Sequence, residues 1–300
     1  MKRFFPYLVL FLGVLTVSTA SILIRLAQQL AVSSAMIAAG RLCLAALIIS
    51  PIAWFRARNE IKKLPPRDLL GALAAGFFLA LHFALWITSL EYTSVASSAA
   101  LVATNPLWVS LGSFFFLREK INRSLGIGIF LTVGGSILIS FSDTGSSAYG
   151  QMPLIGDGLA LLGALAASSN LLLTRSLRSR LSLIAYIWLA YTSAALILLF
   201  WVILSGQPIF GHPPFGYLLL FALALGPQLL GHTAFNWALR YLSATFVAIA
   251  ILGEPIGATL LARWCFGEEF VPLQLAGFFC LMVGIYIAAS SEREAPPLPA

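Results

Sequence analysis

The chain has 300 residues, of which 60% are hydrophobic and 10% are charged, and its mean hydropathy is +0.94. These values exclude an ordinary soluble domain and predict a polytopic, all-α integral membrane protein. The formal net charge of +7 comes from Lys and Arg between apolar segments, so it indicates membrane topology and not a nucleic-acid-binding surface.

The apolar segments follow one another along the whole chain. A helix that crosses a bilayer needs about 20 apolar residues, so a chain of this length has room for about ten spans. We predict helices over residues 4–24, 34–55, 68–88, 94–117, 124–141, 154–174, 183–204, 215–239, 243–265 and 272–290. A cleaved signal peptide is the alternative for the first segment, although its apolar run is longer than a typical signal core.

These segments divide into two halves. The first half covers residues 1–142, and a linker rich in Ser and Gly covers residues 143–153. The second half covers residues 154–291. Residues 292–300 contain several prolines and are predicted to be disordered.

The basic residues indicate the orientation of the chain. With the N-terminus inside, only Arg25, Arg41 and Arg263 of the 18 Lys and Arg residues lie away from the inner loops. Positive charge is retained on the cytoplasmic side, so we expect both termini in the cytoplasm. The minimal loops favour a bacterial inner (cytoplasmic) membrane, with an organelle membrane as the alternative.

A weak internal repeat relates the two halves. Subtracting 149 from each residue number places Pro255 on Pro106 and Glu268 on Glu119, and Glu254-Pro255 becomes the counterpart of Asn105-Pro106. Five spans in each half would insert the halves in opposite orientations. Inverted repeats with interrupted helices at corresponding positions are typical of secondary transporters.

Two doubled motifs carry a family resemblance. Residues 92–96, 103–107 and 117–119, and their echo at residues 241–244, 254–255 and 266–268, resemble the EamA-type members of the drug/metabolite transporter superfamily. The resemblance extends from about Tyr7 to Ser290. It implies ten helices in two inverted five-helix repeats around a central cavity, and secondary transport, often export, of amino acids or other small metabolites. It does not imply a particular substrate.

Glu254 is the leading candidate for the functional group. An acidic side chain inside a membrane is costly, by roughly 2.5–3.5 kcal/mol on insertion scales, and therefore marks a candidate site. We expect its carboxyl group to bind and release a proton or to pair with a substrate amine; the alternative is a packing role beside backbone freed by Pro255. Asn105, its equivalent in the first half, either contacts the ligand or caps backbone freed by Pro106.

Two histidines lie in apolar segments. His82 and His232 are candidates for a proton relay or for ligand contact, and the alternative is a histidine satisfied by local hydrogen bonds. Gln228, His232 and Asn236 recur every four residues, so we predict that they form one polar stripe facing a cavity or another helix.

Three further polar or aromatic residues complete the candidate site. Trp86 follows His82 by four residues and is expected either to stack on a planar or cationic substrate or to pack in an aromatic belt. Arg41 is a candidate for holding a substrate carboxylate or for pairing across helices, with snorkelling to the outer surface as the alternative. Asn170 is a candidate cavity-lining residue.

The remaining features indicate structure. Glu119 and Glu268 end corresponding helices, where a structural role is favoured over a gate. Three cysteines lie one per apolar segment and have no metal-ligand spacing. The sequence predicts no metal site and no cofactor, and no compact set of acid and nucleophile indicates an enzyme.

We therefore expect a secondary transporter of small organic molecules, embedded in a lipid bilayer. Protons or a counter-substrate are the candidate coupling partners, no nucleic acid is expected to bind, and the sequence does not define an oligomeric state. The alternatives are a channel or a structural membrane protein whose polar residues only pack helices, and an integral-membrane enzyme.

Overall fold

The computed structural model describes residues 5–117, 123–143, 152–242, 244–268 and 271–290. Several sequence predictions lie outside these residues: Glu119, the tail at residues 292–300, most of the linker, and the basic residues Lys2, Arg3, Arg118, Lys120 and Arg293.

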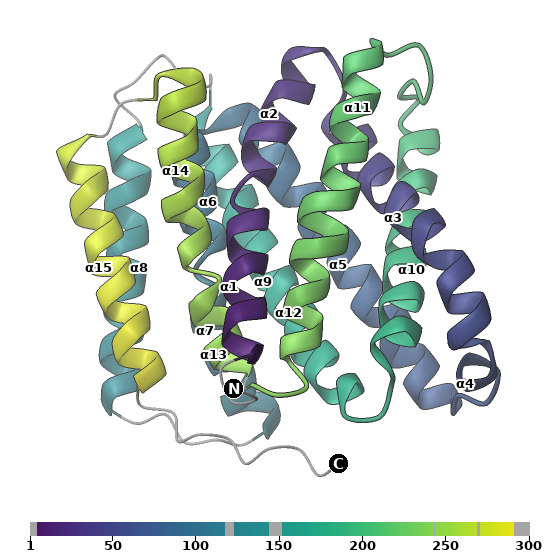
Figure 1. The fold of residues 1–300 in the computed structure, drawn as a ribbon. Coiled ribbons are helices and arrows are strands. Elements are labelled where there is room, and N and C mark those ends of the chain that lie inside the picture. The colour runs from purple at the N-terminus through teal and green to yellow at the C-terminus, as the bar shows by residue number, and fades with distance from the viewer. Residues whose placement is uncertain (1–4, 118–122, 144–151, 243, 269–270, 291–300) are drawn as a thin grey trace.

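The described residues form helices joined by short connections, without a β-strand (Figure 1). The helices of the first half are α1 (Phe5–Val17), α2 (Ala20–Gln29), α3 (Ser34–Arg56), α4 (Arg58–Lys62), α5 (Pro66–Tyr92), α6 (Val95–Val102), α7 (Asn105–Leu117) and α8 (Arg123–Asp143). Those of the second half are α9 (Pro153–Arg178), α10 (Leu183–Leu204), α11 (Pro214–Leu223), the π-helix η1 (Ala224–His232), α12 (Thr233–Ala238), α13 (Ala244–Ala250), α14 (Gly253–Phe266) and α15 (Pro272–Ser290).

Local sequence explains where many helices begin. The hydroxyl groups of Ser33, Ser94 and Ser182 accept hydrogen bonds from backbone N–H groups three residues ahead, which caps α3, α6 and α10. A proline starts each of α5, α9, α11 and α15, where its missing N–H would have had no partner in the helix. The predicted segments are therefore helical, but four of them are interrupted.

Several helices are suited to a bilayer. Seven helices or helix pairs within the described residues are long and apolar enough to cross a membrane, beginning at Phe5, Ser34, Pro66, Val95, Pro153, Leu183 and Pro214. Many large apolar side chains on their outer faces are exposed; Phe55 and Leu196, for example, are 83% and 63% exposed. An exposed apolar surface of this kind fits lipid contact.

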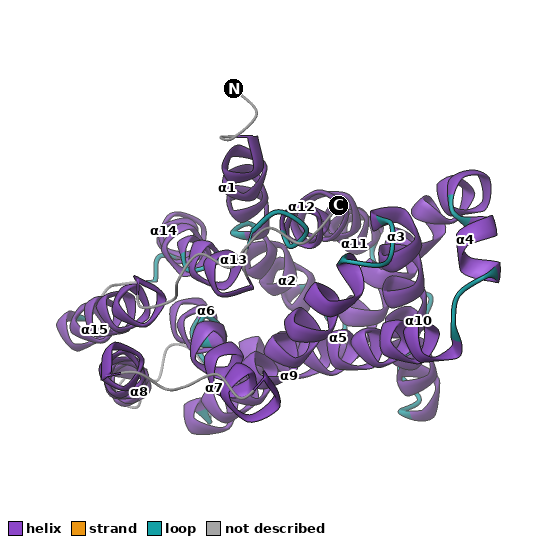
Figure 2. Cartoon of the chain, turned by 90° about the horizontal axis from the view of Figure 1, so that it is seen from below, coloured by secondary structure: helices purple, strands orange, loops and turns teal. Residues whose placement is uncertain are grey.

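The helices are arranged along one long axis when the molecule is viewed along its helices (Figure 2). The pair α8 and α15 lies at one end of this axis, and α3, α4 and α10 lie toward the other. Between them, α9 packs along α5 on one side, and α1 packs against η1 and α12 on the other. The interrupted helices α6–α7 and α13–α14 occupy the space between the α8–α15 pair and the rest of the molecule.

Ionic and polar contacts tie the helices together at the end where α4 lies. Asp68 forms an ion pair with Arg180 at 2.6 Å. The carboxylate of Glu60 accepts hydrogen bonds from the backbone N–H and the hydroxyl of Ser182, at 2.7 and 2.5 Å. These contacts join α4 and the start of α5 to the connection between α9 and α10.

A second set of contacts lies at the opposite end of α5. Arg25 pairs with Glu268 at 2.9 Å and donates hydrogen bonds to the carbonyl groups of Leu90 and Thr93. The same Glu268 oxygen accepts from the backbone N–H of Val95 at 3.3 Å. Arg25 is therefore largely buried where α2, α14 and the turn between α5 and α6 meet.

Close packing of α8 on α15 depends on one glycine. A Cβ atom at Gly135 would lie 2.6 Å from the carbonyl oxygen of Gly277 and 2.7 Å from the amide nitrogen of Leu281, whereas a Cβ atom at the neighbouring Gly134 would meet nothing within 4 Å. Gly135→Ala should therefore lower the free energy of unfolding by about 1–3 kcal/mol through overpacking. Gly134→Ala should be neutral or stabilising, because alanine has the higher helix propensity by up to ~1 kcal/mol.

Thermal unfolding of the purified protein in detergent micelles checks this pair of variants. Equal melting temperatures for the two alanine variants would contradict the close approach of α8 and α15.

Candidate functional site

Two interrupted helices form the centre of the site. The helix predicted over residues 94–117 breaks between α6 and α7, and the one predicted over residues 243–265 breaks between α13 and α14. Pro106 is the second residue of α7 and Pro255 is the third residue of α14. A proline in the first turn removes an N–H group that has no helical partner, so each proline starts a new helix instead of kinking a continuous one.

The two breaks lie next to each other. α6 packs against α14, and α7 packs against α13. Ala103 from the first break and Leu252 from the second lie in one small apolar cluster with Ala100 and Leu281. This contact brings Asn105 and Glu254, the first polar side chains of the two restarted helices, to the same pocket.

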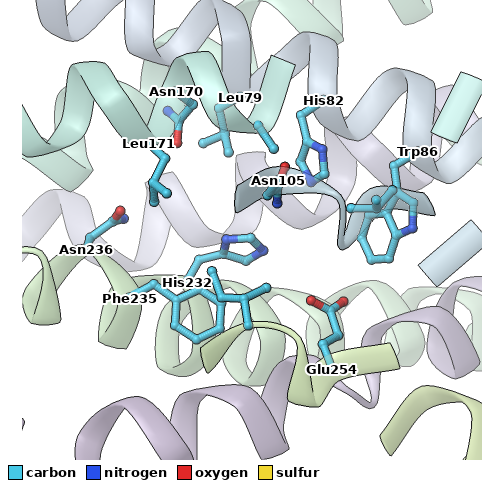
Figure 3. A pocket seen from close by; sticks show the side chains of 13 residues that line it. Leu79, His82, Trp86, Asn105, Asn170, Leu171, His232, Phe235, Asn236 and Glu254 are labelled. Carbon is cyan, nitrogen blue, oxygen red and sulfur yellow. The ribbon is translucent and has the colours of Figure 1, made fainter. Parts of the chain in front are cut away.

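The pocket has a volume of about 60 Å³, several times the space that one water molecule requires. Seven of the nine predicted binding residues line it (Figure 3): His82, Trp86, Asn105, Asn170, His232, Asn236 and Glu254. Apolar side chains complete the wall: Leu79, Val102, Ala167, Leu171, Phe235 and Ile251. The lining therefore combines apolar side chains with six polar ones, namely two histidines, three asparagines and Glu254.

Glu254 presents its carboxyl group to this pocket. The residue is 9% exposed, and its carboxyl group points into the space between His232 and Trp86 (Figure 3). No hydrogen bond or ion pair joins this carboxyl group to a described residue; the backbone N–H of Glu254 bonds to the carbonyl of Ile251 instead. Its position in the first turn of α14 favours a negative charge through the helix dipole.

Asn105 is fixed by a neighbouring helix. Its side-chain oxygen and its backbone carbonyl lie 3.1 and 3.2 Å from the hydroxyl of Ser168 on α9, and this hydroxyl also lies 2.8 Å from the carbonyl of Ala164 in its own helix. The two equivalent positions thus differ in their surroundings, because Asn105 is held by the protein while the Glu254 carboxyl group is not.

His82 and Trp86 form a stacked pair on α5. Their rings are 5.6 Å apart with an interplanar angle of 8°. The Nδ1 atom of His82 lies 3.0 Å from the carbonyl oxygen of Gly163. A carbonyl oxygen only accepts, so Nδ1 carries the proton, and in the neutral ring Nε2 is left as an acceptor.

His232 and the two asparagines occupy the other walls. His232 makes edge contacts with the rings of Phe83 and Phe235, at 5.3 and 5.7 Å between centroids. Asn170 donates to the carbonyl of Ala75 at 2.8 Å, and Asn236 donates to the hydroxyl of Tyr191 at 3.3 Å. Each amide therefore has a structural partner as well as a place at the pocket.

Arg41 and Gln228 are buried but do not line the pocket. Arg41 is 0% exposed, with its guanidinium group 4.1 Å from the centroid of the Phe83 ring, so it does not snorkel to a surface. Gln228 is also 0% exposed. It lies in the π-helix η1, and of the predicted stripe His232 and Asn236 line the pocket while Gln228 is buried elsewhere.

Sequence reasoning missed two residues beside the pocket. The Tyr191 hydroxyl is hydrogen-bonded to Asn236 and lies 3.2 Å from the hydroxyl of Thr233. A tyrosine in the middle of an apolar segment is a polar signal that could have indicated this role. Phe83, which contacts both Arg41 and His232, gives no such signal because it lies in a run of apolar residues.

The architecture and the pocket together define a class of protein. Apolar helices of membrane-spanning length surround a pocket where two interrupted helices meet, which is the arrangement of a membrane transporter. The EamA-like transporter family matches the chain over residues 4–141 and again over residues 154–290. The chain belongs to this family, which confirms the resemblance carried by its motifs, and it is an integral membrane transporter.

Curated relatives agree with this assignment. "Uncharacterized transporter YetK" of Bacillus subtilis strain 168 is 23% identical, over 100% of this chain and 96% of that protein. An "Uncharacterized transporter" of Clostridium kluyveri is 24% identical, over 84% of this chain and 82% of its own. "Uncharacterized transporter YxxF" of Bacillus subtilis is 32% identical over 46% of this chain and 44% of its own.

A solved structure shows the same fold. The chain is similar to a protein described as "Crystal structure of protein", with a TM-score of 0.67, 17% identity, and coverage of 94% of this chain and 96% of that chain. At this identity the likeness concerns the fold alone.

The bond between Ser168 and Asn105 can be tested with adjacent serines. Ser168→Ala leaves a buried Asn105 oxygen without its donor, and we expect the free energy of unfolding to fall by about 1–3 kcal/mol. Ser169→Ala is the matched control, because the Ser169 hydroxyl is exposed and bonds only to a carbonyl of its own helix. Thermal unfolding in detergent measures the stability of both variants. A loss of stability in Ser169→Ala alone would contradict the placement of Asn105.

Proposed function

We propose that this transporter is a secondary carrier that exports small organic metabolites, such as amino acids or related compounds, by alternating access, with Glu254 as the group that binds a proton or a substrate amine. The observation that carries the proposal is the Glu254 carboxyl group, which faces a pocket at the meeting point of two helix breaks and has no partner among the described residues. A carboxyl group so placed can exchange protons or ligands with the pocket without first breaking a structural bond.

The proposed architecture is ten transmembrane helices in two inverted repeats, formed by residues 1–142 and 154–291. Helix contacts support it, because they come in pairs that exchange of the halves would relate. α3 and α10 occupy corresponding places in the two halves and contact each other, and so do α8 and α15. The contact of α5 with α9 has its counterpart in the contact of η1 and α12 with α1. The two separate family matches agree with the same division.

The proposed orientation places both termini in the cytoplasm of a bacterial cell, with the chain in the inner membrane. The described basic residues around α4 and the end of α9 support it, since they lie at one end of the helices: Arg56, Arg58, Lys62, Lys63, Arg67, Arg175, Arg178 and Arg180. Arg25 and Glu268, at the other end, then lie on the outer side.

The two ion pairs suggest how access alternates. The Arg25–Glu268 pair joins α2 and α14 to the turn between α5 and α6, and this set of contacts would close the outer end of the pocket. The Asp68–Arg180 pair would hold the inner end. We infer that each turnover breaks the contacts at one end and forms those at the other, while Glu254 changes its proton or ligand.

Two other functions make different predictions. A channel or a structural protein would show no saturable flux and no exchange of one substrate for another. An integral-membrane enzyme would form a product in detergent without a gradient. The open carboxyl group of Glu254 favours the carrier over a protein in which polar residues only pack helices.

Glu254→Gln tests the carrier proposal. The variant keeps the size and hydrogen-bonding ability of the side chain but cannot change its charge, so we expect a roughly tenfold or larger loss of flux, corresponding to a charge-assisted contact of about 1.5–3 kcal/mol. Remaining flux should no longer depend on pH. Untargeted measurement of metabolites retained and released by producing cells, at two external pH values, identifies the compound and the effect.

Glu91→Gln is the control for an exposed acid outside the pocket; its carboxylate accepts a hydrogen bond from Ser34 at 2.5 Å, which a glutamine oxygen can also accept. Both variants are first checked for normal membrane insertion. Identical metabolite profiles in wild type and Glu254→Gln would count against the mechanism and favour a channel or a structural protein.

The outer gate can be tested by labelling a pocket residue. Val102→Cys, in a chain whose native cysteines Cys43, Cys265 and Cys280 are replaced, reports access of a membrane-impermeant maleimide from outside intact cells. Adding Glu268→Gln should speed labelling, because it removes one charge of the outer ion pair. Adding Asp68→Asn, which weakens the ion pair at the other end, should not speed labelling. The reverse result would show that the orientation of the chain is inverted.

A further inference from the structure

Arg41 is a buried cation without a counter-charge in contact with it. It lies in α3 and is 0% exposed, and its Nε, Nη1 and Nη2 atoms have no hydrogen-bond partner among the described residues. Removing a charge from water without a partner costs several kcal/mol in proteins, and buried arginines are therefore normally paired. Arg178 shows the usual solution in this molecule, since it is buried and donates to the carbonyl groups of Asn236 and Leu181.

The position of Arg41 relates it to the pocket. Its guanidinium group lies 4.1 Å from the centroid of the Phe83 ring. The same ring contacts His82 and His232, at 4.9 and 5.3 Å between centroids, and both histidines line the pocket. Phe83 therefore contacts both the guanidinium group and two histidines of the pocket wall. A cation over a ring face is stabilised, but the N–H groups of the guanidinium are not satisfied by it.

The acids within the described residues form no ion pair with Arg41. Among the described residues, Glu268 pairs with Arg25 and Asp68 pairs with Arg180. Glu254 is close enough to Arg41 to interact electrostatically, but it forms no ion pair with it and presents its carboxyl group to the pocket. When Glu254 holds a proton or a substrate amine, Arg41 has no anion left to balance it.

The side-chain amide of Gln228 is a second buried group without a hydrogen-bond partner among the described residues, and Tyr191 links it to Arg41. Tyr191 interacts electrostatically with Arg41, and its hydroxyl lies 3.5 Å from the backbone carbonyl of Gln228. Both polar atoms of the Gln228 side chain are buried without a partner among the described residues. A ligand that entered this region would find a cation and an amide that the protein itself does not satisfy.

We propose that Arg41 is the subsite for a carboxylate group of the transported molecule, which reaches the guanidinium when the ring of Phe83 moves aside. The planar, five-donor guanidinium matches a carboxylate in a bidentate way. The apolar wall of the pocket then accommodates an apolar body on the same molecule: Leu79, Trp86, Val102, Leu171, Phe235 and Ile251. This inference rests on the proposed transport function and narrows its substrate class to apolar organic acids, with or without an amine for Glu254.

The first test uses the stability of the ligand-free protein. Because the charge of Arg41 has no partner in contact, Arg41→Met should raise the melting temperature of the purified full-length protein in nanodiscs of neutral lipid. Arg178→Met, which removes a buried arginine with hydrogen-bond partners, should lower it. A lower melting temperature, or failure to fold, for Arg41→Met while Arg41→Lys folds would show that Arg41 is a structural residue, and would overturn the proposal.

The second test uses pairs of ligands that differ at one group, a carboxylate in one and the corresponding amide in the other. Phenylacetate with phenylacetamide, isovalerate with isovaleramide, and leucine with leucinamide are each titrated against the protein, and stabilisation against heat is measured at constant ionic strength. We expect at least one acid to bind roughly tenfold or more tightly than its amide. Arg41→Met should remove this preference, and Arg41→Lys should keep only part of it, since an ammonium group lacks the bidentate geometry.

Several results would contradict the proposal. They are the absence of any preference for an acid over its amide, a preference that survives in Arg41→Met, and a loss of stability in Glu254→Gln that disappears when Arg41→Met is combined with it. The last result would identify Glu254 as the structural counter-ion of Arg41. These binding and stability measurements need no gradient, so a negative result in them counts against the Arg41 subsite and not against transport. The flux test on Glu254 decides the carrier mechanism separately.

Discussion

The dominant constraint on this molecule is that polar groups inside a bilayer must be satisfied within the protein or within a cavity. Each helix break frees backbone groups and brings polar side chains to membrane depth, so a break is tolerated only where other parts of the chain surround it. Here the two breaks pack against each other through Ala103 and Leu252, and α9 holds Asn105 through Ser168. The pocket, its histidines and the unpaired Glu254 all follow from that meeting of two interrupted helices.

The sequence was informative where composition and periodicity decide the outcome. Apolar segments predicted where the helices lie, and the pairs Asn105-Pro106 and Glu254-Pro255 were found from an internal offset. The nature of the interruption was not predictable, because a proline inside a helix and a proline in the first turn of a new helix read alike. The π-helix around Pro227 was not predictable for a related reason, because periodicity assumes a constant number of residues per turn. Arg41 was recognised as unusual, but only the fold showed that it is buried against Phe83.

The comparisons and the geometry contribute different parts of the conclusion. Membership of the EamA-like family and the shared fold at 17% identity show which scaffold the chain uses. They do not bear on what is carried, because members of one scaffold differ in the residues that face the ligand. In this chain the proposed candidates for those residues are an acid from one half, an amide at the equivalent position of the other half, and a buried arginine in contact with an aromatic ring. The residues that differ between the two halves are therefore better candidates for determining the substrate than the residues that the halves share.

The unequal pair Asn105 and Glu254 has a consequence for energetics. Two halves of the same design would be expected to offer two equivalent carboxyl groups, yet the two equivalent positions hold one carboxyl, Glu254, and one amide, Asn105. If this carboxyl group carries the coupling proton, the stoichiometry is limited to one proton for each turnover at this position. The proton-motive force could then supply the work of at most one proton for each substrate molecule moved. The charge on the substrate would decide whether a turnover is electrically neutral.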